Sequence, residues 1–282
     1  MLATTGATGQ LGRKVVASLL QRISASDIVV TVRDAGKARD LGVSVRAADY
    51  REPLKLERAF AGIDRLLLIS SSSFETRQAE HANVIAAARA AGVRHIVYTS
   101  LLHADQWTPG FARDHVKTEE WLKSSGLAYT ILRNGWYWEN HTVALGAALA
   151  QGSMAGSAGD APISWASRQD FADAAVSVLT GEGHAGMTYE LAGDQAHTMA
   201  DLAAEAMRQS GRPLAYHNLT EQEHAALYAR IGLPPPIAAM LADVEANGVA
   251  KGLLRDDGHA LSRLIGRPTL RLDQAVAETL AA

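Results

Sequence analysis

Three glycines at a spacing of three residues, Gly6, Gly9 and Gly12, lie close to the N-terminus in the stretch TGATGQLG. Residues 2–5 can form a short strand that runs into this turn, and a helix can begin at Gln10. Glycines at such a turn let backbone N–H groups approach a pyrophosphate, and the N-terminus of the helix favours negative charge. Glycines also serve ordinary turns, but their position after a first strand predicts a dinucleotide site.

The end of the second predicted strand indicates which dinucleotide is bound. The strand at 27–33 ends on Arg33, and Lys37 follows in the next loop. An acidic residue at this point would accept hydrogen bonds from the ribose 2′-OH of NAD, whereas an arginine can pair with the 2′-phosphate of NADP. The sequence therefore predicts NADPH in preference to NADH. The alternative is that Arg33 is a surface charge and that Asp34 contacts the ribose.

Two further polar groups follow predicted strands. Asp49 ends the third strand, where it can meet the adenine or cap a loop. Ser70–Ser73 follow the fourth strand, whose carboxyl end should open onto a ligand crevice. Their hydroxyls could bind ribose or nicotinamide, although serine runs are also common in loops. We therefore count Asp49 and the serines among the candidate cofactor contacts.

Short β-rich runs alternate with helix-like stretches over the first half of the chain. Strands are predicted at 27–33, 43–50, 65–70, 94–100 and 128–134, and helices at 9–21, 54–61, 78–91 and 114–125. The strands are continuously apolar rather than alternating, which is typical of a parallel sheet covered on both faces. A doubly wound α/β fold is predicted.

The pattern loosens after Asn134, where a Gly- and Ser-rich connection leads into a series of helices. We predict a dinucleotide-binding domain over 1–134, with 151–176 returning to it. A smaller, helix-rich region over 135–282 would cap the substrate.

Several kinds of chemistry and partner are excluded. The 282-residue chain has no cysteine and a net charge of -3, with its basic residues scattered, and it lacks Gly-x-Ser-x-Gly and His-Glu-x-x-His motifs. These features argue against thiolate and metal sites, hydrolase chemistry and binding to nucleic acid or membrane. No stretch approaches the ~20 apolar residues that span a bilayer. We expect a cytoplasmic monomer or homodimer with a small-molecule partner.

A family resemblance rests on several motifs together. TGATGQLG, VVTVRDAGKA, LLLISSS, NVIAAARAAGVRHIVYTSLLHAD, YTILRNGWYWEN and YELAGD resemble the NmrA-like branch of the atypical short-chain dehydrogenases. Within it the chain looks similar to the NADPH-dependent quinone oxidoreductase type 2 enzymes and, one step further away, to the triphenylmethane reductases. The similarity extends from residue 2 to near the C-terminus, where KGLLRDD and LSRLIGRPT also match.

The resemblance implies a Rossmann domain, a small C-terminal domain and a substrate cleft between them. It implies cofactor contacts from Gly6, Thr8, Gly9, Gln10, Leu11, Gly12, Arg33, Ser71, Ser72, Ser73, Asn134, Gly135, Trp136, Tyr137, Asn140 and Arg168. Arg168 and Asp170 have an alternative role as part of a helix N-terminal cap.

The conventional family pair of catalytic residues is missing, because no Tyr-x-x-x-Lys occurs in the chain. Alignment to the family's helix puts Phe111 at the Tyr position and His115 at the Lys position. Reduction of a ketone by hydride leaves a basic alkoxide that needs an acid, whereas a quinone leaves a phenolate that water protonates easily. We therefore predict an NADPH:quinone oxidoreductase. The alternatives are a reductase of triphenylmethane or azo dyes and an NAD(P)-sensing regulatory protein without turnover.

The acceptor site is predicted from aromatic residues that follow the sixth strand. Trp136, Tyr137 and Trp138 could form a wall on which a flat, quinone-like substrate stacks beside the nicotinamide. Packing between domains is the alternative. No catalytic residue is assigned; His115 is a candidate for stabilising the product oxyanion or donating a proton, unless it is a helix-surface residue.

Overall fold

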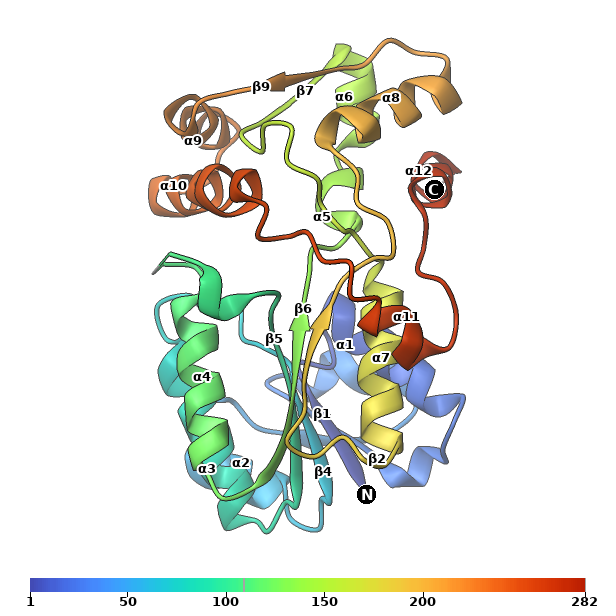
Figure 1. Ribbon diagram of the computed structural model, residues 1–282. Coiled ribbons are helices and arrows are strands. Elements are labelled where there is room, and N and C mark those ends of the chain that lie inside the picture. The colour runs from blue at the N-terminus through green and yellow to red at the C-terminus, as the bar shows by residue number, and fades with distance from the viewer. Residues whose placement is uncertain (109, 282) are drawn as a thin grey trace.

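The structure, a computed structural model, describes residues 1–108 and 110–281. Its centre is a seven-stranded parallel sheet in the order β3-β2-β1-β4-β5-β6-β8 (Figure 1). The strands are β1 Leu2–Thr5, β2 Ile28–Val32, β3 Ser44–Ala47, β4 Arg65–Leu68, β5 His95–Leu101, β6 Ala128–Asn134 and β8 Thr188–Leu191. The predicted doubly wound α/β fold is confirmed, and the seventh strand, β8, was not predicted.

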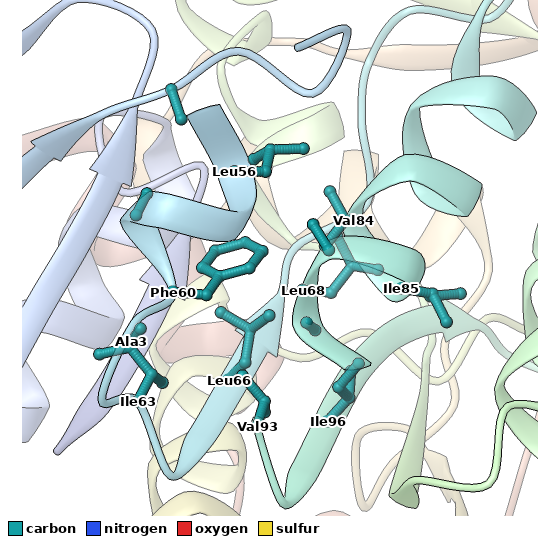
Figure 2. Close-up of a cluster of buried hydrophobic side chains, with 14 of the residues drawn as sticks. Ala3, Leu56, Phe60, Ile63, Leu66, Leu68, Val84, Ile85, Val93 and Ile96 are labelled. Atoms are coloured by element: carbon teal, nitrogen blue, oxygen red, sulfur yellow. The ribbon is translucent and has the colours of Figure 1, made fainter. Parts of the chain in front are cut away.

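Helices cover both faces of the sheet. They are α1 Gln10–Leu20, α7 Arg168–Thr180 and α11 Ala260–Ile265 on one face, and α2 Pro53–Ala59, α3 Arg77–Ala90 and α4 Arg113–Ser124 on the other. Along β4, Leu66 and Leu68 pack towards α2, α3 and α4, whereas Leu67 packs towards α1 and α7. Figure 2 shows the first of these clusters, in which Phe60 lies over Leu66. Both faces are buried, as the continuously apolar strands require.

The sheet has a topological switch point beside β1. The chain leaves β1 for β2 on one side, and β4 pairs with β1 on the other side. The carboxyl ends of β1 and β4 therefore open a crevice, which is where ligands bind in such sheets. The glycine turn follows β1 and the serine run follows β4, so the switch point brings them together.

A second region lies beyond the carboxyl ends of the strands (Figure 1). Its elements are α5 Glu139–Thr142, α6 Leu145–Gln151, β7 Ser153–Gly156, α8 Met199–Ser210, β9 Ala215–Asn218, α9 Glu221–Arg230, α10 Pro235–Asp243, a π-helical turn at Val244–Gly248 and α12 Leu272–Ala281. β7 and β9 pair in parallel as a separate two-stranded sheet. Trp138 and Trp165 lie in the core of this region, at 2% and 1% exposure.

Elements that follow residue 134 also join the large sheet. α7 packs against α1, and β8 pairs with β6. The segment 151–176 was predicted to return to this sheet. Part of it, β7, does not do so, because β7 pairs with β9 in the small sheet. The Gly- and Ser-rich sequence of β7 is typical of a connection, and only pairing with a distant strand makes it β-structure.

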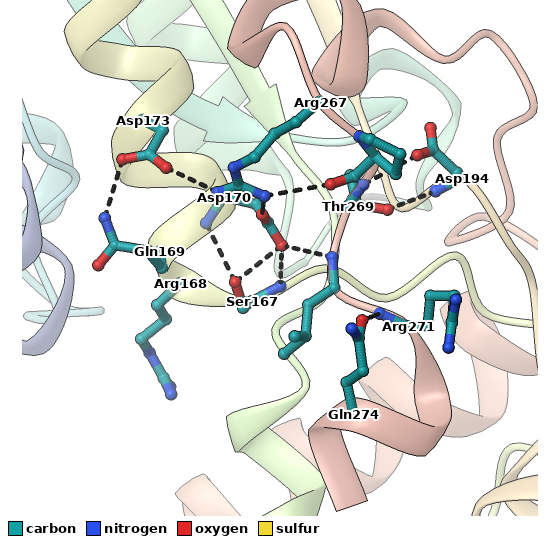
Figure 3. A network of polar contacts seen from close by, with 12 residues as sticks. Ser167, Arg168, Gln169, Asp170, Asp173, Asp194, Arg267, Thr269, Arg271 and Gln274 are labelled. Atoms are coloured by element: carbon teal, nitrogen blue, oxygen red, sulfur yellow. Dashed lines mark hydrogen bonds and ion pairs between the residues drawn. The ribbon is translucent and has the colours of Figure 1, made fainter. Parts of the chain in front are cut away.

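The chain then returns to α7 through residues 266–271, which we name the C-terminal strap (Figure 3). Arg267 Nη1 donates to Asp170 Oδ1 at 2.6 Å and Arg267 Nη2 to Asp173 Oδ2 at 2.7 Å. The backbone N–H of Leu270 donates to Asp170 Oδ2 at 3.1 Å. The strap thereby ties the C-terminal region to the first turns of α7.

Among the residues described, no helix has the length and apolar character needed to cross a bilayer.

Candidate functional site

The glycine turn brings the backbone of α1 against the end of β1. Gly6 has a φ of +62°, and the N–H of Gly9 donates to its carbonyl at 3.0 Å. A Cβ on Gly12 would lie 2.3 Å from the Gly6 oxygen and 2.7 Å from the Cα of Ala7. Only glycine fits at residue 12, and the first turn of α1 is held next to the crevice.

A cavity of about 760 Å³ lies at the switch point. The residues that line it and were predicted as cofactor contacts are Gly6, Thr8, Gly9, Gln10, Leu11, Gly12, Arg33, Asp49, Ser71, Ser72, Ser73, Tyr137 and Arg168. Asn134, Gly135, Trp136 and Asn140 were also predicted and do not line it. The structure thus brings together residues from six segments of the chain.

One end of the cavity carries positive charge. Arg33 and Lys37 line it and are exposed. Arg13, which the sequence analysis missed, lines it as well and donates to the Lys37 carbonyl at 2.9 Å and to Asp40 at 2.6 Å. Arg13 therefore holds the Lys37 segment against α1. Its place in the first turn after the glycines was the available signal.

Asp34 and Asp49 both have partners within the protein. Asp34 accepts the N–H of Gly36 at 2.8 Å and so caps the following turn, and it does not line the cavity. Asp49 accepts Arg51 Nε and Nη2 at 3.0 and 2.9 Å, and these hydrogen bonds lower its pKa to about 2. Asp34 thus lies outside the cavity lining, and Asp49 lines the cavity with its carboxylate paired to Arg51.

The serine run is held in place by buried side chains of α3. His81 Nε2 accepts the N–H of Ser71 at 2.9 Å, and the Ser71 hydroxyl donates to Glu80. His81 Nδ1 lies 2.9 Å from Thr118 Oγ1, whose proton is given to the Asp114 carbonyl, so Nδ1 carries the His81 proton. Burial lowers the pKa of His81 to about 3. A neutral, fully buried ring therefore supports the serine run from behind the cavity wall.

Arg168 closes another side of the cavity. Its guanidinium lies 4.7 Å from the centroid of the Tyr137 ring and donates to Asn140 Oδ1 at 2.7 Å. Its backbone N–H donates to the carboxylate of Glu139 at 3.0 Å. The helix cap is formed by Ser167 and Asp170, which form a capping box. Arg168 can therefore face the cavity while its neighbours begin α7.

The aromatic residues after β6 point to different places. Tyr137 lines the cavity, whereas Trp136 packs against Phe111, with 6.4 Å between ring centroids. Trp138 is 2% exposed and stacks on Trp165 at 4.7 Å, and its indole N–H donates to the Leu270 carbonyl. The predicted wall of three neighbouring aromatics is therefore wrong for Trp138, because the C-terminal core encloses that side chain.

His115 is not on the helix surface. It is 7% exposed, and its Nδ1 lies 2.9 Å from the Tyr98 hydroxyl. Burial, reinforced by the charge of Arg77, lowers the pKa of His115 well below its usual value. The ring is neutral at pH 7 and does not supply the imidazolium proton that the sequence analysis considered.

The cavity lining fits a dinucleotide. Thr31 Oγ1 and Ser70 Oγ, both from lining residues, are buried and have no hydrogen-bond partner among the residues that the structure describes. Such hydroxyls in a cavity wall await a ligand or water. Tyr50 also lines the cavity and donates to the Ile69 carbonyl at 3.1 Å. Among the described residues, no group of histidines and carboxylates is arranged to hold a metal ion.

Further lining residues were missed by the sequence analysis. Besides Arg13 they are Thr31, Val32, Ala48, Tyr50, Ile69 and Glu80; Lys37 was noted there only as a neighbouring charge, and Ser70 was included in the predicted serine run and lines the cavity. Thr31, Val32, Ala48 and Ile69 adjoin the ends of strands, so the strand ends themselves were their signal. Glu80 had no such signal, because its place depends on how α3 packs.

Comparison with known proteins agrees with this geometry. The family model described as NAD(P)H-binding matches residues 6–182. Quinone oxidoreductase 2 of Escherichia coli (strain K12) is 50% identical over 280 residues, which cover 98% of each chain. The crystal structure of the E. coli NADPH-dependent quinone oxidoreductase complexed with NADPH has a TM-score of 0.97 at 49% identity, covering 99% of this chain and 100% of that one.

A second solved structure is similar over the same length. Citrobacter sp. triphenylmethane reductase complexed with NADP(H) has a TM-score of 0.94 at 35% identity, covering 99% of this chain and 100% of that one. The two relatives reduce different acceptors according to their names, and both structures contain the same type of dinucleotide. The match to the family model, the cavity and these full-length likenesses lead to one conclusion: the chain belongs to the NAD(P)H-binding family that includes quinone oxidoreductase 2 of E. coli.

Proposed function

We propose that this protein oxidises NADPH and transfers hydride directly to a quinone, without a Tyr/Lys pair. The observation that carries the proposal is the cavity at the switch point, which is lined by Arg33 and Lys37, by the Ser71–Ser73 run, and by Tyr137 and Arg168. Half of the sequence is identical to that of a quinone oxidoreductase over nearly the full chain, which supports the same acceptor class.

Different residues of the cavity bind different parts of NADPH. The backbone of the glycine turn and the N-terminus of α1 receive the pyrophosphate, and Arg33 with Lys37 receives the 2′-phosphate. Ser71–Ser73, Tyr137 and Arg168 surround the nicotinamide half. When bound there, NADPH supplies the hydride, and the protein contributes orientation and exclusion of water.

The acceptor is expected to be one whose product needs no strong acid. Two-electron reduction of a quinone by hydride leaves a phenolate, which resembles the tyrosine side chain with its pKa of about 10 and takes a proton from water. His115 is neutral and buried, so it is a poor acid at pH 7. A simple ketone would leave a far more basic oxygen, which needs a well-placed acid.

We also propose a division of labour along the chain. Residues 1–134 with α7 and β8 form the cofactor-binding domain, and the remaining C-terminal region caps the acceptor. The cavity supports this division, because its lining comes from residues 6–80 together with Tyr137 and Arg168.

The direct test is NADPH consumption with 1,4-benzoquinone, measured by the loss of NADPH absorbance, with NADH in parallel. We expect rapid turnover with NADPH preferred. Tight NADPH binding without turnover on any quinone or dye would instead support a cofactor-sensing regulator, and no binding at all would contradict both.

Reduction of a dye is a second candidate, favoured by the 35% identity to a triphenylmethane reductase. Steady-state rates on benzoquinone and on a cationic triphenylmethane dye, measured side by side, rank the two. A higher kcat/KM for the dye would count against the quinone as the main acceptor.

A further inference from the structure

One buried cation near the cavity forms no direct ion pair. Arg77, the first residue of α3, is 4% exposed. Its Nε donates to the Ser71 carbonyl at 2.7 Å, while its Nη1 is buried without a hydrogen-bond partner. Among residues 1–108 and 110–281, no carboxylate forms an ion pair with this guanidinium. A buried charge of this kind is costly and needs an explanation.

The position of Arg77 adds to this cost. A positive charge at the N-terminus of a helix is opposed by the helix dipole. Two carboxylates in its neighbourhood, Glu80 and Asp114, attract its charge and partly offset the cost of burial. Neither hydrogen-bonds the guanidinium: Glu80 accepts the hydroxyls of Ser71 and Thr76, and Asp114 accepts the side-chain amide of Gln78 at 2.7 Å.

Arg77 lies behind Phe74, the first of three aromatic side chains in contact with one another. Its guanidinium carbon is 4.6 Å from the centroid of Phe74, a side chain 37% exposed. Phe111 is 6.3 Å from Phe74 and 6.4 Å from Trp136, centroid to centroid. We name Phe74, Phe111 and Trp136 the aromatic arch. Its two ends adjoin Ser73 and Tyr137, and both of these residues line the cavity.

The charge of Arg77 is felt by its neighbours. Burial is the main reason that the pKa of His81 and that of His115 are lowered, and the charge of Arg77 is the next cause for both. His115 in turn lies 6.2 Å from Phe111, centroid to centroid. The charge of Arg77 therefore acts on groups beneath the aromatic arch, in a part of the molecule where water screens it weakly.

We propose that Arg77 stabilises, from behind Phe74, the negative charge that develops on a neutral acceptor stacked on the aromatic arch. The inference rests on the proposed quinone reductase function. The quinone accepts hydride from NADPH at one oxygen, the π electrons of its ring shift onto the other oxygen, and the product is the hydroquinone monoanion, a phenolate. NADPH loses the hydride and is oxidised by two electrons to NADP⁺. The phenolate then takes one proton from water. Arg77 is a positioning residue for this charge, because Phe74 lies between it and the acceptor.

The sign of the charge makes the inference testable. Hydride transfer to a neutral quinone creates negative charge, which Arg77 favours. A cationic triphenylmethane dye is repelled by the same arginine when it binds. Removal of the charge should therefore slow quinone reduction and tighten dye binding, whereas a merely structural fault would impair both acceptors in the same direction.

The experiment compares Arg77→Met, Arg77→Lys and Arg89→Met. Arg89 is exposed in the last turn of the same helix, so its variant matches the change in net charge. We measure kcat and KM for 1,4-benzoquinone and for a cationic triphenylmethane dye, together with the NADPH dissociation constant. Arg77→Gln is the second neutral variant, should Arg77→Met fail to fold.

We expect Arg77→Met to lower kcat for benzoquinone by about tenfold to hundredfold, less than the loss of a direct oxyanion donor commonly costs. Its KM for the dye should fall, Arg77→Lys should recover most of the quinone rate, and NADPH binding should change no more than in Arg89→Met. Equal losses of kcat/KM with both acceptors, or quinone kinetics like those of Arg89→Met, would overturn the inference about Arg77 and leave the proposed function standing. A wild-type protein that binds NADPH and reduces no quinone would overturn the proposed function as well.

Discussion

The glycine turn and the aromatic segment after β6 are both short and each contains three characteristic residues. In the turn, all three glycines line one cavity, and Gly12 approaches the Gly6 carbonyl so closely that a Cβ would be 2.3 Å from it. In the aromatic segment only Tyr137 lines that cavity, while Trp138 stacks on Trp165 in the C-terminal core.

The difference follows from what each segment touches. The glycine turn is defined by contacts among residues 5–13, so its shape depends on the local backbone. The side chains after β6 are directed by the packing of the C-terminal region, to which Trp138 contributes its hydrogen bond to the Leu270 carbonyl. The structure of a motif can be predicted from sequence when the residues that it contacts are near in the chain. It is harder to predict when those residues are distant.

The largest effect is expected where the aromatic segment enters the C-terminal core. Trp138→Ala should lower the free energy of unfolding by about 3–5 kcal/mol, because it leaves a cavity beside Trp165. KM for benzoquinone should stay unchanged in the protein that remains folded. Urea unfolding and steady-state kinetics test this. Trp136→Ala is the matched variant, and we expect it to raise KM for the quinone; a raised KM in Trp138→Ala alone would reverse our assignment.

The local character of the glycine turn gives the next prediction. Gly12→Ala should cost about 1–3 kcal/mol of stability, because its Cβ collides with backbone atoms of residues 6 and 7. The thermal stabilisation by NADPH should be lost with it. Gly146, in α6, is the control, since a Cβ there meets nothing within 4 Å. Equal NADPH stabilisation in Gly12→Ala and Gly146→Ala would show that the turn does not hold the cofactor.

Arg33 gives a further test of a contact that was predicted from local sequence. Arg33→Ala should weaken NADPH by about 1.5–3 kcal/mol, the range for hydrogen bonds to charged groups, and should leave NADH almost unchanged. Asp34→Ala tests the alternative ribose contact, and Arg39→Ala controls for the lost charge nearby. Fluorescence titrations with both dinucleotides give the dissociation constants. If Arg33→Ala weakens the binding of NADH as much as that of NADPH, Arg33 does not contact the 2′-phosphate.

The smallest effect concerns His81, whose role depends on tertiary packing. Its pKa is lowered by burial from 6.5 to about 3, so between these values the unfolded chain binds more protons than the folded one. Stability is therefore full above pH 6.5 and falls as the pH drops towards 3, by at most about 1.4 kcal/mol per pH unit for this histidine. His115 acts in the same direction.

Urea unfolding from about pH 7 down to about pH 5 measures this slope. His81→Gln should flatten it by about one proton, while His217→Gln, at an exposed position, should not. Protonation of His81 also removes the acceptor for the Ser71 N–H, so NADPH affinity should decline over the same range. A slope that is identical in all three proteins would mean that His81 is not buried in its neutral form.

Much of the large sheet was predictable, because its strands are continuous apolar runs separated by amphipathic helices. The predicted strand at 27–33 became Ile28–Val32, and the predicted helix at 114–125 became Arg113–Ser124. β8 was missed because Thr188–Leu191 is short and only half buried, and its pairing with β6 makes it part of the sheet. The C-terminal strap was not predictable, since Arg267 finds Asp170 across almost one hundred residues of chain.

The glycine turn, the alternation of strands and helices and the position of Arg33 after β2 follow from local sequence, because each depends on residues that are close together in the chain. The enclosure of Trp138, the neutral state of His115 and the burial of Arg77 behind Phe74 follow instead from packing between distant segments. Burial and its effect on charge are properties of surfaces brought together from distant segments. They arise when the layers close around the sheet, and no local pattern carries them.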